Sequence, residues 1–304
     1  MKTNKIIVIG SCNTDMTVIT DRLPKPGETV LGGEFKMFSG GKGANQAVAI
    51  ARMGGIVTLI AKTGNDIFGK QLVEQYEKEC IDTQFTFLDD NLSTGVALIT
   101  VDKNGENCIT VSSGANDSLL PDDINRAIST FDNTEIILMQ LEIPMPTVEY
   151  VAKTAFGKGI KVILNPAPAA ALSCELIKCL YAIIPNRIEA EFLSGIKITD
   201  FESAKNASDV IAEKGVDKVI ITLGNKGTFV KEGQSYYKIP AFNVQPVDTT
   251  AAGDTFCGTF CLALSENRSI REAVEIANKA ASITVSRLGA QSSIPYREEV
   301  IPNE

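Results

Sequence analysis

IILMQLEIPMPTVEYVAKTAFGKGIKVIL, residues 136–164, contains the unit from which the fold can be predicted. The apolar runs at 136–140 and 161–164 predict two strands that are buried on both faces. The helical spacing of apolar residues over 145–156 predicts the helix that joins them. A strand–helix–strand unit of this kind is typical of a parallel sheet that is covered by helices on both sides.

The rest of the chain repeats this alternation of strands and helices. Further strand-like runs lie at 6–9, 57–61, 182–184 and 218–222, and helical patterns at 44–53, 68–79, 189–193 and 202–214. A hairpin-like stretch at 228–239 precedes two final helices. We therefore predict an α/β fold with a central, mostly parallel sheet flanked by helices. Since no linker or repeat stands out, residues 1–304 are expected to form a single domain.

Two regions interrupt the alternation. Residues 16–38 carry a Pro-Lys-Pro-Gly turn, and residues 95–111 read as two strands around Lys103-Asn104-Gly105. Both patterns indicate antiparallel pieces that can form a small separate β sheet. Because ligands of α/β proteins lie beyond the carboxyl ends of the strands, we expect this sheet to serve as a lid. Its unpaired edges favour a homodimer that forms through the lid.

The composition excludes several classes of protein. The chain has no histidine, so it cannot use a Ser-His-Asp or Cys-His pair or bind zinc through histidine. Its seven cysteines include no Cys-x-x-Cys pair, which indicates reduced thiols and a cytoplasmic protein. A net charge of −8 without basic blocks argues against nucleic acid and anionic membranes as partners. The apolar stretches are also too short to span a membrane.

Residues 248–260, DTTAAGDTFCGTF, predict an anion-binding site. Small residues lead into an apolar helix, and the first turn of a helix presents unpaired N–H groups at the positive end of its dipole. Asp254 lies in that first turn and can serve as a base toward a substrate hydroxyl. The alternative is that Asp254 only offsets the helix dipole and Asp248 caps a turn.

A second stretch, SGGKGANQ at residues 39–46, opens a helix with a glycine loop. A dinucleotide-binding fingerprint would require glycine at Gln46, and no Walker A string occurs in the chain. These absences argue against a nicotinamide-dependent oxidoreductase. The side chains of Lys42 and Asn45 suit a ligand with many hydroxyl groups, although a simple glycine turn before a helix remains the alternative.

Polar side chains follow most of the predicted strands. They are Asn13, Asp15, Glu142, Asn165, Asn186, Glu189 and Thr222. The carboxyl ends of parallel strands meet at one edge of a sheet, so these side chains predict a site at that edge. Asn186 and Glu189 are three positions apart and share a helix face, which suits hydrated Mg²⁺. Asn186 by itself is better explained as a helix cap or turn residue.

From about residue 6 to residue 299 the chain resembles the ribokinase family of sugar and nucleoside kinases. GGKGAN at 40–45 and DTTAAGDTF at 248–256 carry the resemblance, together with MQLE at 139–142, LNPAP at 164–168 and GAQ at 289–291. The resemblance implies a ribokinase-like fold and ATP-dependent phosphorylation of a small sugar. For the ribokinases of the family, the reacting group is the 5-hydroxyl of D-ribose.

The resemblance also implies roles for individual residues. Asp254 would be the catalytic base, and Ala251, Ala252 and Gly253 would form the anion hole. The implied sugar pocket consists of Asn13, Asp15, Gly41, Lys42, Asn45, Glu142 and Asp254. The implied nucleotide site consists of Asn186, Thr222, Gly224, Gly227, Gly253 and Asn278, with Asn186 and Glu189 organising Mg²⁺ indirectly. The implied K⁺ site consists of Asp248, Thr250, Thr284, Arg287, Gly289 and Ser293.

Two residues depart from the family pattern. Arg187 stands inside the N-x-x-E element, where ribokinases often carry an acid, and Asn278 replaces an aromatic ring that often lies near the adenine.

A carboxylate at a helix N-terminus, such as that of Asp254, is expected to be a weak base. A weak base is sufficient for phosphoryl transfer.

Other substrates and classes remain open. Deoxyribose, fructose or a nucleoside could replace ribose, although the absence of tryptophan and 6% aromatic residues disfavour a nucleoside pocket. A phosphosugar would require more cations than Lys42 alone. A non-catalytic sugar-binding protein could dispense with Asp254 and the glycines, which this chain retains.

Overall fold

The predicted strand–helix–strand unit forms as expected in the computed structural model, which describes residues 5–103 and 106–302. It belongs to a nine-stranded sheet of order β13-β12-β11-β10-β9-β8-β1-β4-β5. The strands are β1 (Lys5–Ile9), β4 (Ile56–Gly64), β5 (Thr86–Asp89), β8 (Thr134–Met139), β9 (Lys161–Leu164), β10 (Ala182–Ile183), β11 (Lys218–Thr222), β12 (Thr228–Glu232) and β13 (Ser235–Ile239). All pairs from β5 to β11 are parallel, whereas β12 and β13 form the predicted antiparallel hairpin.

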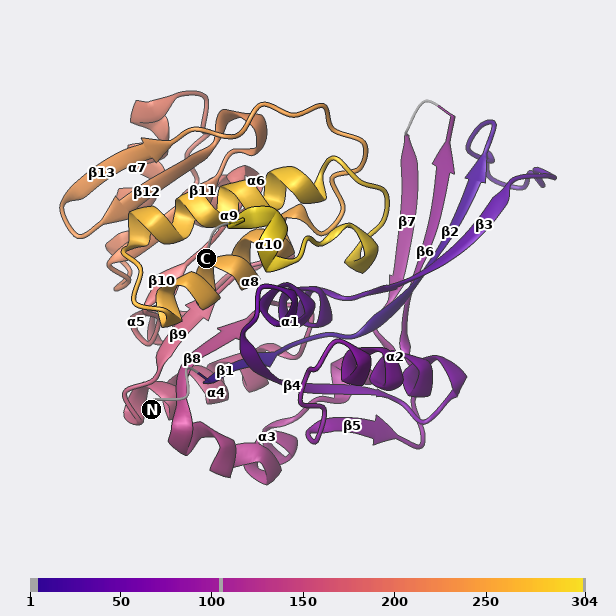
Figure 1. Cartoon of the computed structure of the whole chain (residues 1–304), viewed down its shortest axis with the longest axis horizontal. Helices are drawn as coiled ribbons and strands as arrows, with labels where there is room; N and C mark the ends of the chain where they lie inside the picture. Colours follow the sequence, from indigo (N-terminus) through magenta and orange to yellow (C-terminus); the bar gives the residue numbers. More distant parts are fainter. Residues whose placement is uncertain (1–4, 104–105, 303–304) are drawn as a thin grey trace.

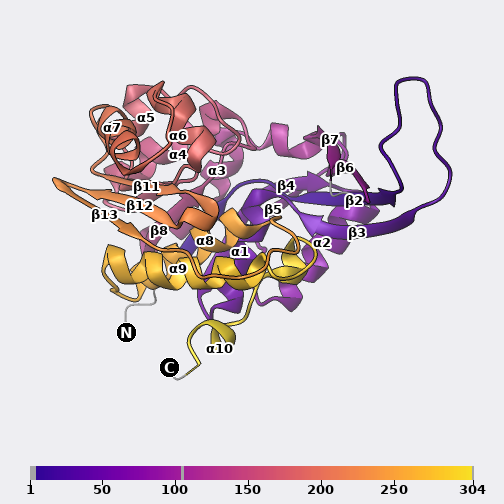
Figure 2. The same ribbon diagram turned by 90° about the horizontal axis from the view of Figure 1, so that it is seen from above.

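Helices cover both faces of this sheet (Figure 2). One face carries α1 (Lys42–Arg52), α2 (Ile67–Lys78), α8 (Ala252–Ser265), α9 (Ile270–Thr284) and α10 (Arg297–Val300). The other carries α3 (Pro121–Ala127), α4 (Met145–Gly157), α5 (Cys174–Lys178), α6 (Arg187–Ser194) and α7 (Phe201–Ala212). Within β1, Ile6 and Val8 join the first core and Ile7 and Ile9 join the second. This alternation explains why the parallel strands are continuous apolar runs.

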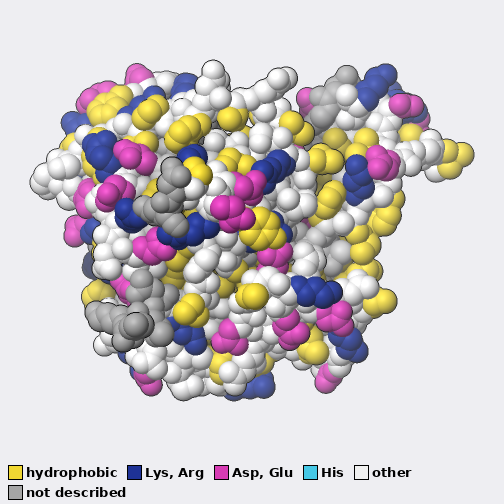
Figure 3. Space-filling view, viewed as in Figure 1, with side chains coloured by type: hydrophobic (Ala, Val, Ile, Leu, Met, Phe, Trp, Pro, Cys, Tyr) yellow, Lys and Arg dark blue, Asp and Glu magenta, His cyan; other side chains and the backbone are white. Residues whose placement is uncertain are grey.

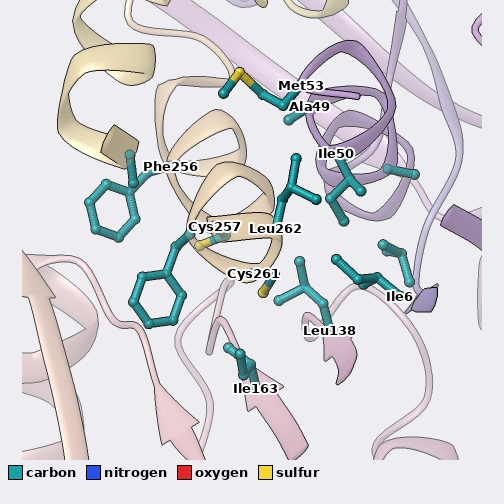
Figure 4. Packing of buried hydrophobic residues seen from close by; sticks show 14 of the residues in the cluster. Ile6, Ala49, Ile50, Met53, Leu138, Ile163, Phe256, Cys257, Cys261 and Leu262 are labelled. Atoms are coloured by element: carbon teal, nitrogen blue, oxygen red, sulfur yellow. The ribbon is translucent and has the colours of Figure 1, made fainter. Parts of the chain in front are cut away.

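Helix α8 is the most deeply buried helix next to the predicted anion site. Every residue from Asp254 to Ser265 is buried. Cys257, Cys261 and Leu262 pack among Ile50 of α1 and Leu138 of β8 (Figure 4). Burial over the length of the helix holds its first turn rigidly at the edge of the sheet.

The predicted small sheet is also present, beside the main body of the protein (Figure 1). It consists of β2 (Asn13–Thr20), β3 (Glu34–Gly40), β6 (Gly95–Asp102) and β7 (Asn107–Ser112) in the order β3-β2-β6-β7. The two outer pairs are antiparallel as predicted, while β2 and β6 pair in parallel. The turn predicted at Asn104 and Gly105 lies outside the described residues.

The seven cysteines are free thiols, of which Cys12, Cys257 and Cys261 are buried. Burial raises the pKa of Cys12 to about 12, so this thiol is an inert core group. Over residues 5–103 and 106–302, none of the helices combines the length and apolar character that crossing a membrane requires.

Candidate active site

A cavity of about 860 Å³ lies between the carboxyl ends of the parallel strands and the inner face of the small sheet. Most of the predicted site residues line it. They are Asn13, Asp15, Gly41, Lys42, Asn45, Glu142, Asn165, Asn186, Glu189, Thr222, Asp248, Thr250, Ala251, Gly253, Asp254 and Gly289. Two sequence motifs that lie more than 200 residues apart therefore meet in one site.

Among the described residues, Asp254 is one of two buried carboxylates that line this cavity, with 7% of its surface exposed, and Glu189 is the other. Asp254 Oδ2 accepts a hydrogen bond from Asn45 Nδ2 at 2.9 Å, and Asp254 Oδ1 accepts one from Gln46 Nε2 at 3.0 Å. Burial raises the pKa of Asp254 above its usual value, although the charge of Lys42 and the two amides act in the opposite direction. The direction of this shift differs from the weak base expected from the helix N-terminus, and burial is its largest cause.

The N-terminus of α8 opens onto the same cavity. Ala251 is the N-cap residue and has a left-handed backbone with φ of 60°. Helix geometry leaves the N–H groups of Ala252, Gly253 and Asp254 without a carbonyl partner inside α8. A Cβ added to Gly253 would meet no atom within 4 Å, so this side of the first turn is open. These features fit an anion at the predicted position.

Lys42 is surrounded by acidic side chains. Its Nζ lies 3.7 Å from Glu142 Oε1. Burial alone would lower the pKa of Lys42, but the charges of Asp254, Glu142 and Glu189 raise it above the usual value. Burial raises the pKa of Asp15 to about 6, and the charges of Glu142 and Asp254 add to this. The cavity thus gathers several carboxyl groups around Lys42.

The glycine loop allows the start of α1 to lie directly against the end of β1. Gly41 has φ of 86°, which favours glycine, and a Cβ there would lie 2.8 Å from Asn13 N. A Cβ on Gly43 would lie 2.6 Å from the backbone of Gly10. The loop therefore brings Lys42 and Asn45 beside Asn13.

Asn186 and Glu189 form a capping box at the start of α6. Asn186 Oδ1 accepts from Glu189 N at 2.9 Å, and Glu189 Oε2 accepts from Asn186 N at 2.8 Å. The helix-cap interpretation of Asn186 is thus correct, and both residues also line the cavity. Burial raises the pKa of Glu189 above its usual value. Arg187 pairs with Glu191 one turn along the helix, at 3.2 Å, and does not line the cavity.

Three predicted nucleotide residues lie outside the cavity. Gly224 and Gly227 form a tight turn after β11, where Leu223 N donates to Gly227 O. Asn278 on α9 accepts from Thr228 Oγ1 at 2.7 Å and donates to Pro240 O at 3.4 Å. These contacts hold Asn278 against the β12–β13 hairpin. The hairpin lies beside the end of β11, where Thr222 lines the cavity.

The predicted K⁺ residues lie on three neighbouring segments. Asp248 Oδ1 accepts from Thr250 N and its Oδ2 accepts from Gly289 N, at 2.9 and 3.0 Å. Thr284 and Ser293 are buried and Arg287 pairs with Glu299. None of these last three residues lines the cavity, whereas Asp248, Thr250 and Gly289 do.

Sequence reasoning missed four polar residues near the site. Gln46, Gln140 and Gln291 are buried amides behind Asp254 and Asn45, and the signal that could have found them is their place in the quoted stretches 39–46, 139–142 and 289–291. Lys36 of β3 lines the cavity and could have been found from strand alternation, because it shares a face with Phe38, the partner of Asp15. The cavity therefore has a second cation besides Lys42.

The family model for pfkB family carbohydrate kinases matches residues 3–297, so the chain belongs to this family. Among curated relatives, it is 44% identical to the ribokinase of Haemophilus influenzae, over 97% of each chain. It is 36% identical to the deoxyribokinase of Salmonella typhi, covering 97% of this chain and 96% of that one. Among solved structures it is similar to an Arabidopsis thaliana ribokinase complexed with ribose and ATP, with a TM-score of 0.90 and 32% identity over 98% and 97% of the two chains.

Proposed function

We propose that this chain is a ribokinase, which transfers the γ-phosphoryl group of ATP to the 5-hydroxyl of D-ribose. One observation carries the proposal. Asp254, a buried carboxylate with a raised pKa, lies in the first turn of α8 and in one cavity with Asp15, Lys42 and Asn45. Full-length similarity to ribokinases, at 44% identity for the Haemophilus influenzae protein, supports ribose as the substrate.

In the proposed reaction, Asp254 accepts the proton of the ribose 5-hydroxyl as its oxygen attacks the γ-phosphorus. The bond between the γ-phosphorus and its bridging oxygen breaks, and ADP leaves. The N–H groups of Ala251, Ala252 and Gly253 stabilise the negative charge on the transferred phosphoryl group, for which that of Ala252 gives up its 3.4 Å hydrogen bond to Thr249 O. Asn13, Asp15, Gly41, Lys42, Asn45 and Glu142 bind the remaining hydroxyls and hold the 5-hydroxyl beside Asp254.

ATP and Mg²⁺ are expected to enter beside the capping box of α6. Asn186, Thr222, Gly224, Gly227, Gly253 and Asn278 are the proposed nucleotide contacts. Among the described residues, no group of three acidic, cysteine or histidine side chains could hold a metal ion. Mg²⁺ is usually bound by one or two protein groups, water and substrate phosphates. The oxygens of Asn186 and Glu189 fit that indirect role, and Mg²⁺ would supply charge neutralisation for the phosphates.

A K⁺ site is proposed at Asp248, Thr250, Thr284, Arg287, Gly289 and Ser293. The segments fit because Val285 O accepts hydrogen bonds from the N–H groups of both Val247 and Asp248, and Asp248 binds Gly289 N. These contacts hold the segments together, and carbonyl and carboxylate oxygens on them would suit a weakly hydrated monovalent cation. K⁺ there would stabilise the loop that leads into the anion hole.

The decisive experiment is ATP consumption by the purified protein with Mg²⁺, with and without K⁺. D-ribose, 2-deoxyribose, fructose, fructose 6-phosphate and adenosine are compared. Strong ribose-dependent turnover that K⁺ increases supports both the activity and the cation site. Preference for 2-deoxyribose would instead assign the chain the activity of its Salmonella typhi relative, and turnover of fructose 6-phosphate would give Lys36 a phosphate-binding role.

We also propose a homodimer that forms through the small sheet. Phe35, Met37 and Leu98 are 59%, 45% and 55% exposed on the face that does not line the cavity, and hydrophobic side chains are visible along this part of the surface (Figure 3). Strands β3 and β7 are the edges of that sheet. Light scattering of the wild type and of Phe35→Lys tests the dimer, which the lysine should weaken.

A further inference from the structure

Asp254 is held from behind by a chain of buried amides that the reaction scheme does not use. Gln46 on α1 donates from Nε2 to Asp254 Oδ1 at 3.0 Å and to Asn165 Oδ1 at 3.2 Å. Its own Oε1 accepts from Gln140 Nε2 at 2.5 Å. Gln46 and Gln140 are both fully buried, and neither lines the substrate cavity.

The orientation of Gln46 follows from a backbone anchor. Asn165 Nδ2 donates to the carbonyl oxygen of Ile184 at 2.9 Å, so Asn165 must present its Oδ1 to Gln46. An ionised carboxylate such as that of Asp254 only accepts hydrogen bonds. Both neighbours therefore require the NH₂ group of Gln46, and the remaining oxygen faces Gln140. The amide has one orientation only.

We propose that Gln46 is a positioning residue for the catalytic base, holding the carboxylate of Asp254 in one rotamer while leaving a lone pair free for the substrate hydroxyl. This inference rests on the proposed function for the role of Asp254. Each carboxylate oxygen has about two acceptor sites, and Gln46 and Asn45 use one on each oxygen. Loss of Gln46 would let the carboxylate of Asp254 rotate. It would also remove a hydrogen-bond donor that stabilises the ionised form of Asp254.

Several charged or titratable groups face Asp254 from neighbouring elements. They are Lys42, Asp15, Glu142, Glu189 and Cys257. Because substitution of Gln46 leaves all five in place, a change in the titration of Asp254 between wild type and variant reports the lost amide.

The test compares Gln46→Met with the wild type and with Thr259→Val, a control at a buried position of α8 outside the site. Gln46→Met should lower kcat by about 10-fold to 100-fold, the size expected for a lost hydrogen bond to a charged group. Ribose affinity measured by calorimetry should change little. The acidic limb of the kcat/KM profile should move to higher pH, whereas Thr259→Val should keep the wild-type profile. A folded Gln46→Met with wild-type kcat and profile would overturn the proposal.

A second readout does not depend on activity. The ¹³C carboxyl resonance of Asp254, assigned with Asp254→Asn, is titrated in the wild type and in Gln46→Met. An upward shift of the titration supports the positioning role even if ribose is not the substrate, and an unchanged titration contradicts it. If Gln46→Met does not fold, Gln46→Glu replaces it. A second carboxyl group beside Asp254 should move the titration midpoint of the pair to higher pH. An unchanged titration curve again contradicts the proposal.

Discussion

Asn45 Nδ2 donates a 2.9 Å hydrogen bond to Asp254 Oδ2, joining two residues 209 positions apart in the chain. Asn45 in turn accepts a hydrogen bond from Gln291 Nε2 at 3.2 Å. Its amide is therefore oriented in the same way as that of Gln46. The glycine loop and the helix N-terminus thus form one site, in which the proposed sugar-binding side chain Asn45 also orients the proposed base.

This double role distinguishes Asn45 from Asp15. Asn45→Ala should weaken ribose binding and also lower kcat, because Asp254 loses a hydrogen-bond donor. Asp15→Asn, which removes a charge but leaves Asp254 bound to both amides, should act mainly on ribose affinity. Steady-state kinetics and calorimetry with ribose separate the two effects. Equal losses of kcat in both variants would contradict this division of roles.

Asp254→Asn should lower kcat by about 10²–10⁴, the usual contribution of a general base, with little change in ribose affinity. The amide cannot accept the hydroxyl proton, although it fills the same volume. The measurement is kcat for ATP-dependent ribose phosphorylation, together with calorimetric ribose binding. Asp217→Asn, at an exposed position outside the cavity, is the matched control and should be fully active. Near-normal turnover of Asp254→Asn would remove Asp254 from its proposed role.

Gly253→Ala and Gly253→Val should fold but lose activity, Gly253→Val by about 10²–10³ in rate. Their Cβ atoms would project into open space at the anion hole and hinder the approach of the phosphoryl group. Gly157→Ala is the control, since a Cβ there also meets no atom within 4 Å. Thermal unfolding and kcat are measured for all three variants. Full activity of Gly253→Val would exclude an anion hole at this turn.

The raised pKa of Asp15 predicts a pH dependence of stability in the absence of ligand. Its pKa is about 6 in the folded protein against 3.8 for the unperturbed group. Between these values the folded state binds the proton and the unfolded state does not, so this group makes stability fall as pH rises from about 4 to about 6. Melting temperatures between pH 4 and 8 should show a smaller fall for Asp15→Asn than for the wild type. Parallel curves would show that Asp15 carries no such shift.

Thr259 offers a stability prediction within α8. Its hydroxyl is buried and has no hydrogen-bond partner in the described structure. Thr259→Val should therefore stabilise the protein by about 1 kcal/mol or leave it unchanged. Thr255→Val is the contrasting variant, because Thr255 Oγ1 accepts from Thr284 Oγ1 at 3.0 Å and its removal should destabilise the fold. Chemical denaturation gives the free energy of unfolding of both variants. A Thr255→Val protein more stable than Thr259→Val would contradict the packing of α8.

The strands of the main sheet and the helices that cover it could be predicted from the sequence because their patterns are local. Ile6–Ile9 and Lys161–Leu164 are apolar runs whose burial on both faces requires helices on each side. The parallel pairing of β2 with β6 could not be read in this way, since it joins segments about 80 residues apart and no turn specifies it.

The same division holds for the site. By itself the sequence determined the candidate site residues, because Asp254, Lys42 and the glycine loops stand out by their side chains and backbone requirements at fixed local spacings. Only the tertiary structure decided that Gln46, Gln140 and Gln291 lie behind Asp254 and Asn45, that Lys36 lines the cavity, and that burial raises the pKa of Asp254. The reason is physical: hydrogen-bond partners and desolvation depend on which distant segments pack together, and no local pattern encodes that.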